Sequence, residues 1–274
     1  MLGFVALIGL VLGASALPSS AISGGDVDGN GHPAVAVITF YQPDGRFRCS
    51  ATLVSPTVLV TAAHCTVGTL NKTLVSFAPV LPTRPRAIDD PGDGTSTIGF
   101  TTGNADWLTG TAHANPAYTG KLQLNDLHDV GVVVLDQPYL GATPVPLPPQ
   151  GYLDALPKPL SKNTATLVGY GVYFTKPADG PQKPTEVNDG IRRVTTAPVQ
   201  SVTTDTLRLA ENEKDGRAGG GSCFGDSGGP VLLGGYLVGD TSNGASPFCR
   251  SAGNYQRLDN ADARAFLSTY VAVP

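Results

Sequence analysis

Hydrophobic residues gather in short runs along this chain, and the runs are rich in Val, Ile, Leu and Thr. Examples lie at residues 35–40, 51–60, 130–135, 165–168 and 231–238. Gly, Pro, Asn and Asp fill the segments between them, and no regular helical pattern intervenes to form parallel crossovers. The pattern therefore predicts an antiparallel all-β fold. Residues 132–135 are continuously apolar, which is typical of a strand covered on both faces.

Two segments depart from this strand pattern. Residues 140–159 are crowded with proline, which supplies no backbone donor, and we expect them to link two halves of the chain. Near the end, Asp259 is placed to cap a helix that runs through Ala261 and Phe266 to Tyr270.

The first residues form an apolar, uncharged run at 2–16, which is short of the ~20 residues that a membrane span needs. Small residues follow at 14–16 and 19–21, as in a signal peptide. We therefore assign residues 1–21 to a signal peptide with a short propeptide, and predict a secreted protein with no membrane contact after processing. Cleavage after Ala16 would leave a five-residue propeptide, and cleavage after Ala21 would leave none. Since no Lys or Arg precedes the run, a buried first strand or helix is the alternative.

Charge and cysteine content narrow the class of protein. The formal net charge is −4 and only 15% of residues are charged, so nothing favours nucleic acid as a partner. Four cysteines in an exported chain suggest two disulfides, for which three pairings exist. Structural zinc is disfavoured, because neither a C-x-x-C pair nor an H-x-x-x-H spacing occurs.

The strongest local signal for chemistry is Gly-Asp-Ser-Gly-Gly-Pro at residues 225–230. Two glycines leave the hydroxyl of Ser227 uncrowded. Gly225 permits a backbone shape in which its own N–H and that of Ser227 point into one oxyanion hole. A simple Gly-Pro turn is the alternative reading of this segment.

A serine nucleophile needs a base, and the base needs a group that orients it. Thr-Ala-Ala-His-Cys at residues 61–65 offers His64, whose ring type can be a neutral acceptor near neutral pH. Asp129 directly precedes an apolar strand, where a carboxylate can reach an imidazole N–H. Asp126 competes with Asp129, and a structural histidine and a solvated loop aspartate are the alternatives.

Together, these motifs resemble those of the trypsin/chymotrypsin family of serine peptidases. The T-A-A-H-C and G-D-S-G-G-P segments match the family's motifs letter for letter, in the family's order. The resemblance extends from about Ile22 to the C-terminus. It implies His64, Asp129 and Ser227 as catalytic triad and an endopeptidase that works through an acyl-enzyme.

The resemblance also implies a fold. We expect two antiparallel six-stranded β-barrels followed by a C-terminal helix. Residues 22–145 would form the first barrel with His64 and Asp129, and residues 146–274 the second barrel with Ser227 and the specificity pocket. No metal or cofactor is implied. The expected partners are protein or peptide substrates and protein protease inhibitors, and the expected state is a monomer.

Further features depend on the resemblance. Ile22-Ser-Gly-Gly is similar to the family's mature N-terminus, whose freed amino group pairs with the residue that corresponds to Asp226. Ser23 departs from the usual Val. The family's bridges imply the pairs Cys49–Cys65 and Cys223–Cys249. A third family bridge would fall at positions 165 and 233, and both of its cysteines are absent.

Counting from Ser227 along the family's pattern gives the substrate-binding residues. They are Gly221, Ser222, Ser242, Gly244 and Gly253. Trypsin-like members carry an Asp at the pocket base, where this chain has Gly221, so the pattern predicts a preference for large apolar or aromatic side chains over Arg or Lys. Asn243 stands where the family usually has Trp, which leaves the geometry of the substrate-binding strand open.

Two other functions compete with a peptidase. One is a non-catalytic binding or regulatory protein on the same scaffold, since one fold hosts many functions. The other is an esterase or lipase of another fold, which would have a G-x-S-x-G motif and its histidine last in the chain. Asn71-Lys72-Thr73 is in addition an acceptor sequence for N-glycosylation.

Overall fold

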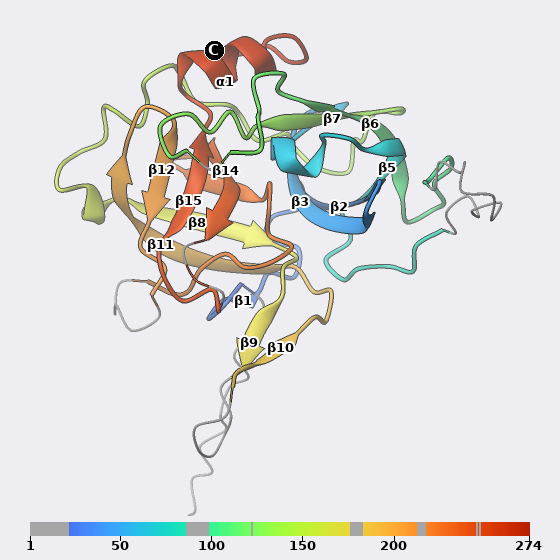
Figure 1. Cartoon of the computed structure of the whole chain (residues 1–274), viewed down its shortest axis with the longest axis horizontal. Helices are drawn as coiled ribbons and strands as arrows, with labels where there is room; N and C mark the ends of the chain where they lie inside the picture. The colour runs from blue at the N-terminus through green and yellow to red at the C-terminus, as the bar shows by residue number, and fades with distance from the viewer. Residues whose placement is uncertain are drawn as a thin grey trace, which may run out of the picture.

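The computed structural model describes residues 22–85, 99–121, 123–175, 183–212, 218–244, 246 and 248–274, so the predicted signal peptide lies outside the described residues. The first barrel is closed in the order β2-β3-β4-β7-β6-β5 (Figure 1). Its strands are β2 (Val35–Gln42), β3 (Gly45–Ser55), β4 (Val58–Thr61), β5 (Leu70–Ser76), β6 (Leu108–Ala114) and β7 (Gly131–Leu135).

The second barrel has the order β11-β12-β15-β14-β13-β8 and closes through the pairing of β11 with β8. Its strands are β8 (Thr164–Gly169), β11 (Arg193–Val202), β12 (Thr206–Leu209), β13 (Pro230–Leu233), β14 (Tyr236–Gly244) and β15 (Gly253–Arg257). Two antiparallel six-stranded barrels with one C-terminal helix confirm the predicted fold class. The hairpin of β9 (Tyr173–Thr175) and β10 (Thr185–Val187) projects from the body of the molecule (Figure 1).

The N-terminal segment joins the second barrel although it precedes the first. β1 (Asp26–Val27) pairs antiparallel with β11, and Ile22 is buried in the second barrel's core. The domain division that the resemblance implies, residues 22–145 and 146–274, placed this segment with the first barrel. The pairing of β1 with β11 is a long-range contact, which local sequence patterns do not predict.

Continuous apolar runs mark strands that pack on both faces. In β2, Ile38 and Phe40 face the interior of the first barrel, whereas Val35 and Val37 pack towards Val168 of the second barrel. In β7, the predicted double coverage also occurs, because alternate valines face the first-barrel core and the helix α1. A one-residue change of register would exchange these two buried faces.

The C-terminal helix α1 (Ala261–Leu267) begins one residue later than predicted. Its N-cap is Asn260, whose Oδ1 accepts from the N–H of Ala263 at 2.9 Å. The assignment of Asp259 as cap is therefore wrong. The carboxylate of Asp259 is fully buried and bound by Arg257 and by the N–H of Leu153, so it is not free to cap. The helix also ends before Tyr270, at Leu267.

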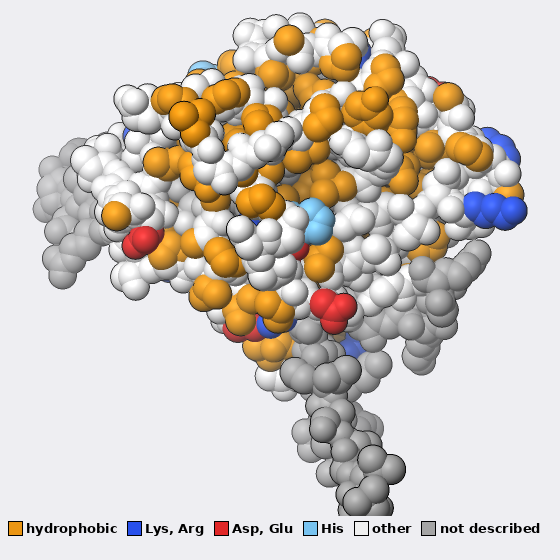
Figure 2. Space-filling model, turned by 180° about the vertical axis from the view of Figure 1, so that it is seen from behind, with side chains coloured by type: hydrophobic (Ala, Val, Ile, Leu, Met, Phe, Trp, Pro, Cys, Tyr) orange, Lys and Arg blue, Asp and Glu red, His pale blue; other side chains and the backbone are white. Residues whose placement is uncertain are grey.

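The surface carries little charge. On the face in Figure 2, apolar and uncharged polar atoms predominate and Lys and Arg atoms form only small spots. This face therefore offers no broad basic surface to a polyanion. In the described part of the chain, no helix has the length and hydrophobicity that a membrane crossing requires.

A buried ion pair lies where the two barrels meet. Arg192, directly before β11, is fully buried, and its Nε donates to Asp28 Oδ2 at 2.8 Å. Its Nη1 donates to the carbonyls of Val35 and Phe77 in the first barrel, at 2.9 and 3.1 Å. The guanidinium thus satisfies backbone acceptors of one barrel while it is anchored in the other.

We predict that Arg192→Met lowers the free energy of unfolding by about 3–5 kcal/mol, because it removes the charge partner of the buried Asp28 carboxylate and a donor to two carbonyls. The matched control is Arg46→Met, an exposed arginine, which should change stability by less than about 0.5 kcal/mol. Denaturant unfolding of both variants measures the difference. A loss below about 1 kcal/mol for Arg192→Met would show that the junction does not depend on this pair.

Candidate functional site

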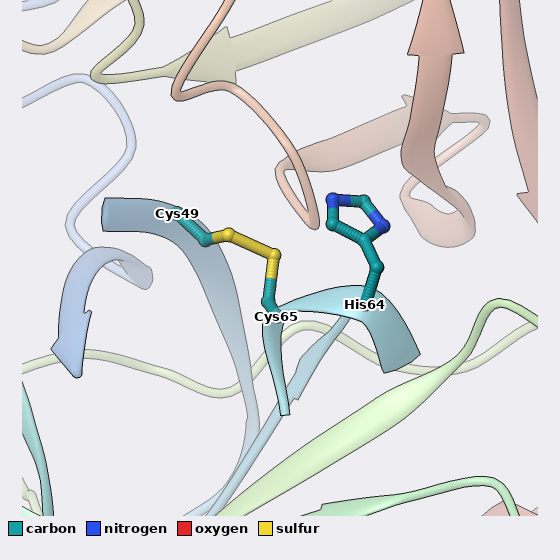
Figure 3. A group of neighbouring side chains, drawn as sticks. All are labelled: Cys49, His64 and Cys65. Atoms are coloured by element: carbon teal, nitrogen blue, oxygen red, sulfur yellow. A yellow bond between two sulfur atoms is a disulfide. The ribbon is translucent and has the colours of Figure 1, made fainter. Parts of the chain in front are cut away.

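His64 is held on a short turn that follows a buried strand. β4 leads directly into the 3-10 turn η1 (Ala63–Cys65), and Cys65 is bonded to Cys49 of β3. Figure 3 shows the imidazole beside this disulfide. The ring is 30% exposed, so it is both fixed by its backbone and open to a ligand.

Asp129 holds the ring from behind. It is fully buried, and its Oδ1 accepts from the backbone N–H of His64 at 2.9 Å. Its Oδ2 lies 2.9 Å from Nδ1 of the ring and accepts from Ser242 Oγ at 2.6 Å. Since a carboxylate only accepts, this contact places the ring proton on Nδ1 and leaves Nε2 with a free lone pair. Asp126 instead contacts His128 and is largely exposed.

The loop that carries Ser227 packs directly on the segment before His64. The carbonyl of Ser227 accepts from the N–H of Ser50 at 2.8 Å, and Thr61 Oγ1 donates to the carbonyl of Ser50 at 2.8 Å. Gly228 has a φ of +71°, and a Cβ there would lie 2.0 Å from Thr61 Oγ1 and 2.7 Å from the nitrogen of Ala62. Only glycine allows this approach.

The Ser227 hydroxyl is partly exposed. Among the described residues it makes no hydrogen bond with the His64 ring, and such contacts commonly tighten only when substrate binds. Gly225 has a φ of +93°, a conformation that favours glycine. Within the described ranges, no acceptor is bonded to the N–H of Gly225 or of Ser227. Both amides are therefore available to an incoming oxyanion.

Asp226 is buried beside the serine. Its carboxylate accepts from the N–H of Gly171 at 2.8 Å and from that of Cys223 at 2.9 Å. Burial raises the pKa of Asp226 to about 7, and these two amides and the charge of Arg48 oppose the rise. No bond to Ile22 occurs in the described part of this uncleaved chain, where Ile22 is an internal residue.

A cavity of about 250 Å³ opens beside Ser227. Three of the predicted substrate-binding residues line it, namely Ser222, Ser242 and Gly244. Gly221 and Gly253 lie behind it, against the side chain of Glu211, which also lines the cavity. Sequence analysis missed Glu211. It stands in a polar, acidic segment that is typical of an exposed loop, and only its contact with two distant glycines reveals its place.

The strand beside this cavity is paired through Asn243, directly after a register shift between Thr241 and Asn243. Asn243 pairs with Asn254 across β14 and β15, and Asn254 Nδ2 donates to Asn243 Oδ1 at 2.9 Å. Gly244 pairs with Gly253 in the same ladder. A side-chain amide pair thus holds the strand together at the position where the family usually has Trp.

Both disulfides that the resemblance implies are present, Cys49–Cys65 and Cys223–Cys249. The first brings two sulfurs and the ring of His64 within 4.8 Å of one another, a cluster of metal-ligand type (Figure 3). Metal-binding cysteine is the thiolate, and here both sulfurs are bonded to each other. This cluster therefore does not serve as a metal site.

Comparison with known proteins relates the chain to a protein family and to a curated relative. The family model described as Trypsin matches residues 21–263. A curated protein named "Trypsin" from Saccharopolyspora erythraea is 29% identical over 233 residues, which cover 81% of this chain and 86% of that protein.

Solved structures share the fold at low sequence identity. An HL collagenase has a TM-score of 0.63 at 17% identity, covering 93% of this chain and 100% of that one. A human heparin binding protein has a TM-score of 0.55 at 17% identity, covering 92% and 98%. With the family model matched over most of its length, the chain belongs to the trypsin family of serine proteases.

Proposed function

We propose that this protein is a secreted serine endopeptidase in which Ser227 is the nucleophile, His64 the general base and Asp129 the group that orients the base. One observation carries the proposal. The buried Asp129 carboxylate binds Nδ1 of His64, while the serine loop packs on the residues directly before that histidine. The base and the nucleophile are therefore presented at one edge, between the two barrels.

The chemistry follows from these positions. Nε2 of His64 takes the proton of the Ser227 hydroxyl as Oγ attacks the scissile carbonyl carbon. The oxygen of the tetrahedral intermediate receives hydrogen bonds from the N–H groups of Gly225 and Ser227. Collapse breaks the C–N bond, and His64 returns its proton to the leaving amine. Water then attacks the acyl-enzyme by the same route and releases the carboxylic acid.

Two features of the cavity favour different substrate side chains at the cleaved bond. Glycine walls at Gly244 and Gly253 favour the large apolar or aromatic side chains that the sequence pattern predicts. The carboxylate of Glu211, which lies against Gly221 and Gly253, favours a cation instead.

A binding protein without catalysis remains the second candidate, because a heparin binding protein is among the similar structures. Two features of this chain weigh against it. His64, Asp129 and Ser227 are all present, and the net charge of −4 does not suit a polyanion.

Ser227→Ala should lower peptide hydrolysis by at least ~10⁴-fold and abolish labelling by a fluorophosphonate, because the attacking oxygen is removed. Ser268→Ala, which changes an exposed serine at the end of α1, is the matched control and should keep both activities. Thermal melts show whether either variant is misfolded. Equal hydrolysis by the Ser227→Ala variant and the wild type would refute the proposed nucleophile.

We infer in addition that cleavage before Ile22 matures the enzyme. In the uncleaved chain Asp226 is buried with two amide donors and no amine. A freed amino group at Ile22 would supply the missing cation, since a buried carboxylate gains strongly from a paired charge. Mass spectrometry of the secreted protein should find Ile22 as its first residue. An active enzyme that begins elsewhere would refute this inference.

The uncleaved chain should lose stability as pH rises from about 4 to about 7, between the ordinary pKa of an aspartate and the raised pKa of Asp226. A carboxyl whose pKa is higher in the folded state stabilises that state at low pH, and the contribution is lost as pH rises towards the folded value, about 7 for Asp226. In a Ser227→Ala background, which prevents self-cleavage, Asp226→Asn should flatten the fall in melting temperature. The exposed control Asp44→Asn should not. Equal slopes in the two variants would show that Asp226 does not titrate in this range.

A further inference from the structure

The carboxylate of Glu211 fills the space that two glycines leave at the end of the cavity beside Ser227. A Cβ added at Gly221 would lie 2.4 Å from the Cβ of Glu211, and one added at Gly253 would lie 2.3 Å from its Oε1. Glu211 is only 2% exposed, yet it lines the cavity. Because Gly221 and Gly253 have no side chains, they leave room for the carboxylate of Glu211. This carboxylate occupies the base of the pocket.

Only neutral groups bind this carboxylate. Ser222 Oγ donates to Oε1 at 3.4 Å, and the hydroxyl of Tyr255 donates to the same oxygen. Among the described residues, no Lys, Arg or His forms an ion pair with Glu211. Burial raises the pKa of Glu211 well above its usual range, and the like charge of Asp226 raises it further.

A buried carboxylate whose donors are two hydroxyls and the backbone of Ser222 lacks the charged partner that would best stabilise it. Glu211 and Ser227 line the same cavity, so a side chain bound beside Ser227 can extend to Glu211. The Cys223–Cys249 disulfide and Ala252 line the path and suit an alkyl stem. An apolar side chain of the same length would bury the carboxylate further and leave it unpaired.

We propose that Glu211 is the specificity-determining residue of this enzyme and selects Lys or Arg at the cleaved bond by pairing with the cationic end of that side chain. The inference rests on the proposed function, since it takes Ser227 in the same cavity as the nucleophile. The acid that trypsin-like members carry at the position of Gly221 is thereby replaced by one from another segment. This assignment replaces the apolar preference expected from the glycine pattern.

The test compares Glu211→Gln with Glu186→Gln, an exposed glutamate on β10, as the matched control. Peptide substrates that differ only in Arg, Lys, Phe or Leu at the cleaved bond measure kcat/KM. Wild type and control should prefer Arg and Lys. Glu211→Gln should lower kcat/KM for them by about 10²–10³-fold, with less than about threefold change for Phe and Leu. Fluorophosphonate labelling of Ser227 should not change in either variant.

Wild-type preference for Phe or Leu, or an unchanged Arg preference in Glu211→Gln, would overturn the proposal.

A second measurement is independent of catalysis. Benzamidine, a planar amidinium, should bind the Ser227→Ala protein in calorimetry and lose most of its affinity when Glu211→Gln is added. Absence of both hydrolysis and fluorophosphonate labelling would refute the proposed function, while benzamidine still tests the pocket. If Glu211→Gln unfolds in thermal melts, Glu211→Asp keeps the charge but shortens its reach, and should weaken benzamidine binding. Equal binding would contradict the proposal.

Discussion

The buried carboxylate of Asp129 is the interaction on which the geometry of the site depends. A charge removed from water needs several donors, and the donors here come from both barrels. His64 belongs to the first barrel and Ser242 to β14 of the second, while the N–H of Asp129 itself donates to Gln256 of β15. The carboxylate of Asp129 has all of its hydrogen-bond donors only when the two barrels are docked. Folding, docking and alignment of the imidazole are therefore coupled.

Buried carboxylates in this protein differ in the hydrogen-bond donors and positive charges that contact them. Asp28 and Asp259 each have an arginine, and the two serve structure at the barrel junction and before α1. Asp226 has two amides, and Glu211 has two hydroxyls and the backbone of Ser222. These two acids, which have no ion-pair partner among the described residues, lie beside Ser227. A cation would stabilise each of them: the enzyme's own N-terminus at Asp226, and the substrate at Glu211. The two acids whose ionised forms are least stabilised by folding thus lie where the proposed function brings a positive partner.

Asp240 extends this contrast. It is fully buried, and neither carboxylate oxygen has a donor among the described residues. Burial raises its pKa well above the usual range, and the charge of Asp129 raises it further. The neutral acid is thus the form that this environment favours. A neutral Asp240 also avoids a second negative charge near Asp129, which would otherwise compete for the donors that orient His64.

The sequence predicted the parts of the site that depend on local structure. Residues 61–65 and 225–230 carry their chemistry in contiguous residues, and Gly228 is required there by one close contact with Thr61. The strands were predictable because apolar runs report burial on both faces. The helix cap was not, because Asp259 and Asn260 are both good caps and the choice was decided by Arg257, which binds the first of them.

Glu211 could not be found this way, and the reason is physical. A glycine in a pocket wall reports that a side chain is absent at that position, but not what fills the space. The same glycines at 221 and 253 fit an open apolar pocket and a pocket closed by an acid from elsewhere. Asn243 pairs with Asn254 and Gly244 with Gly253 across β14 and β15, after a register shift between Thr241 and Asn243. The proposed difference in specificity thus depends on one side chain whose position is set by long-range packing, which no local pattern encodes.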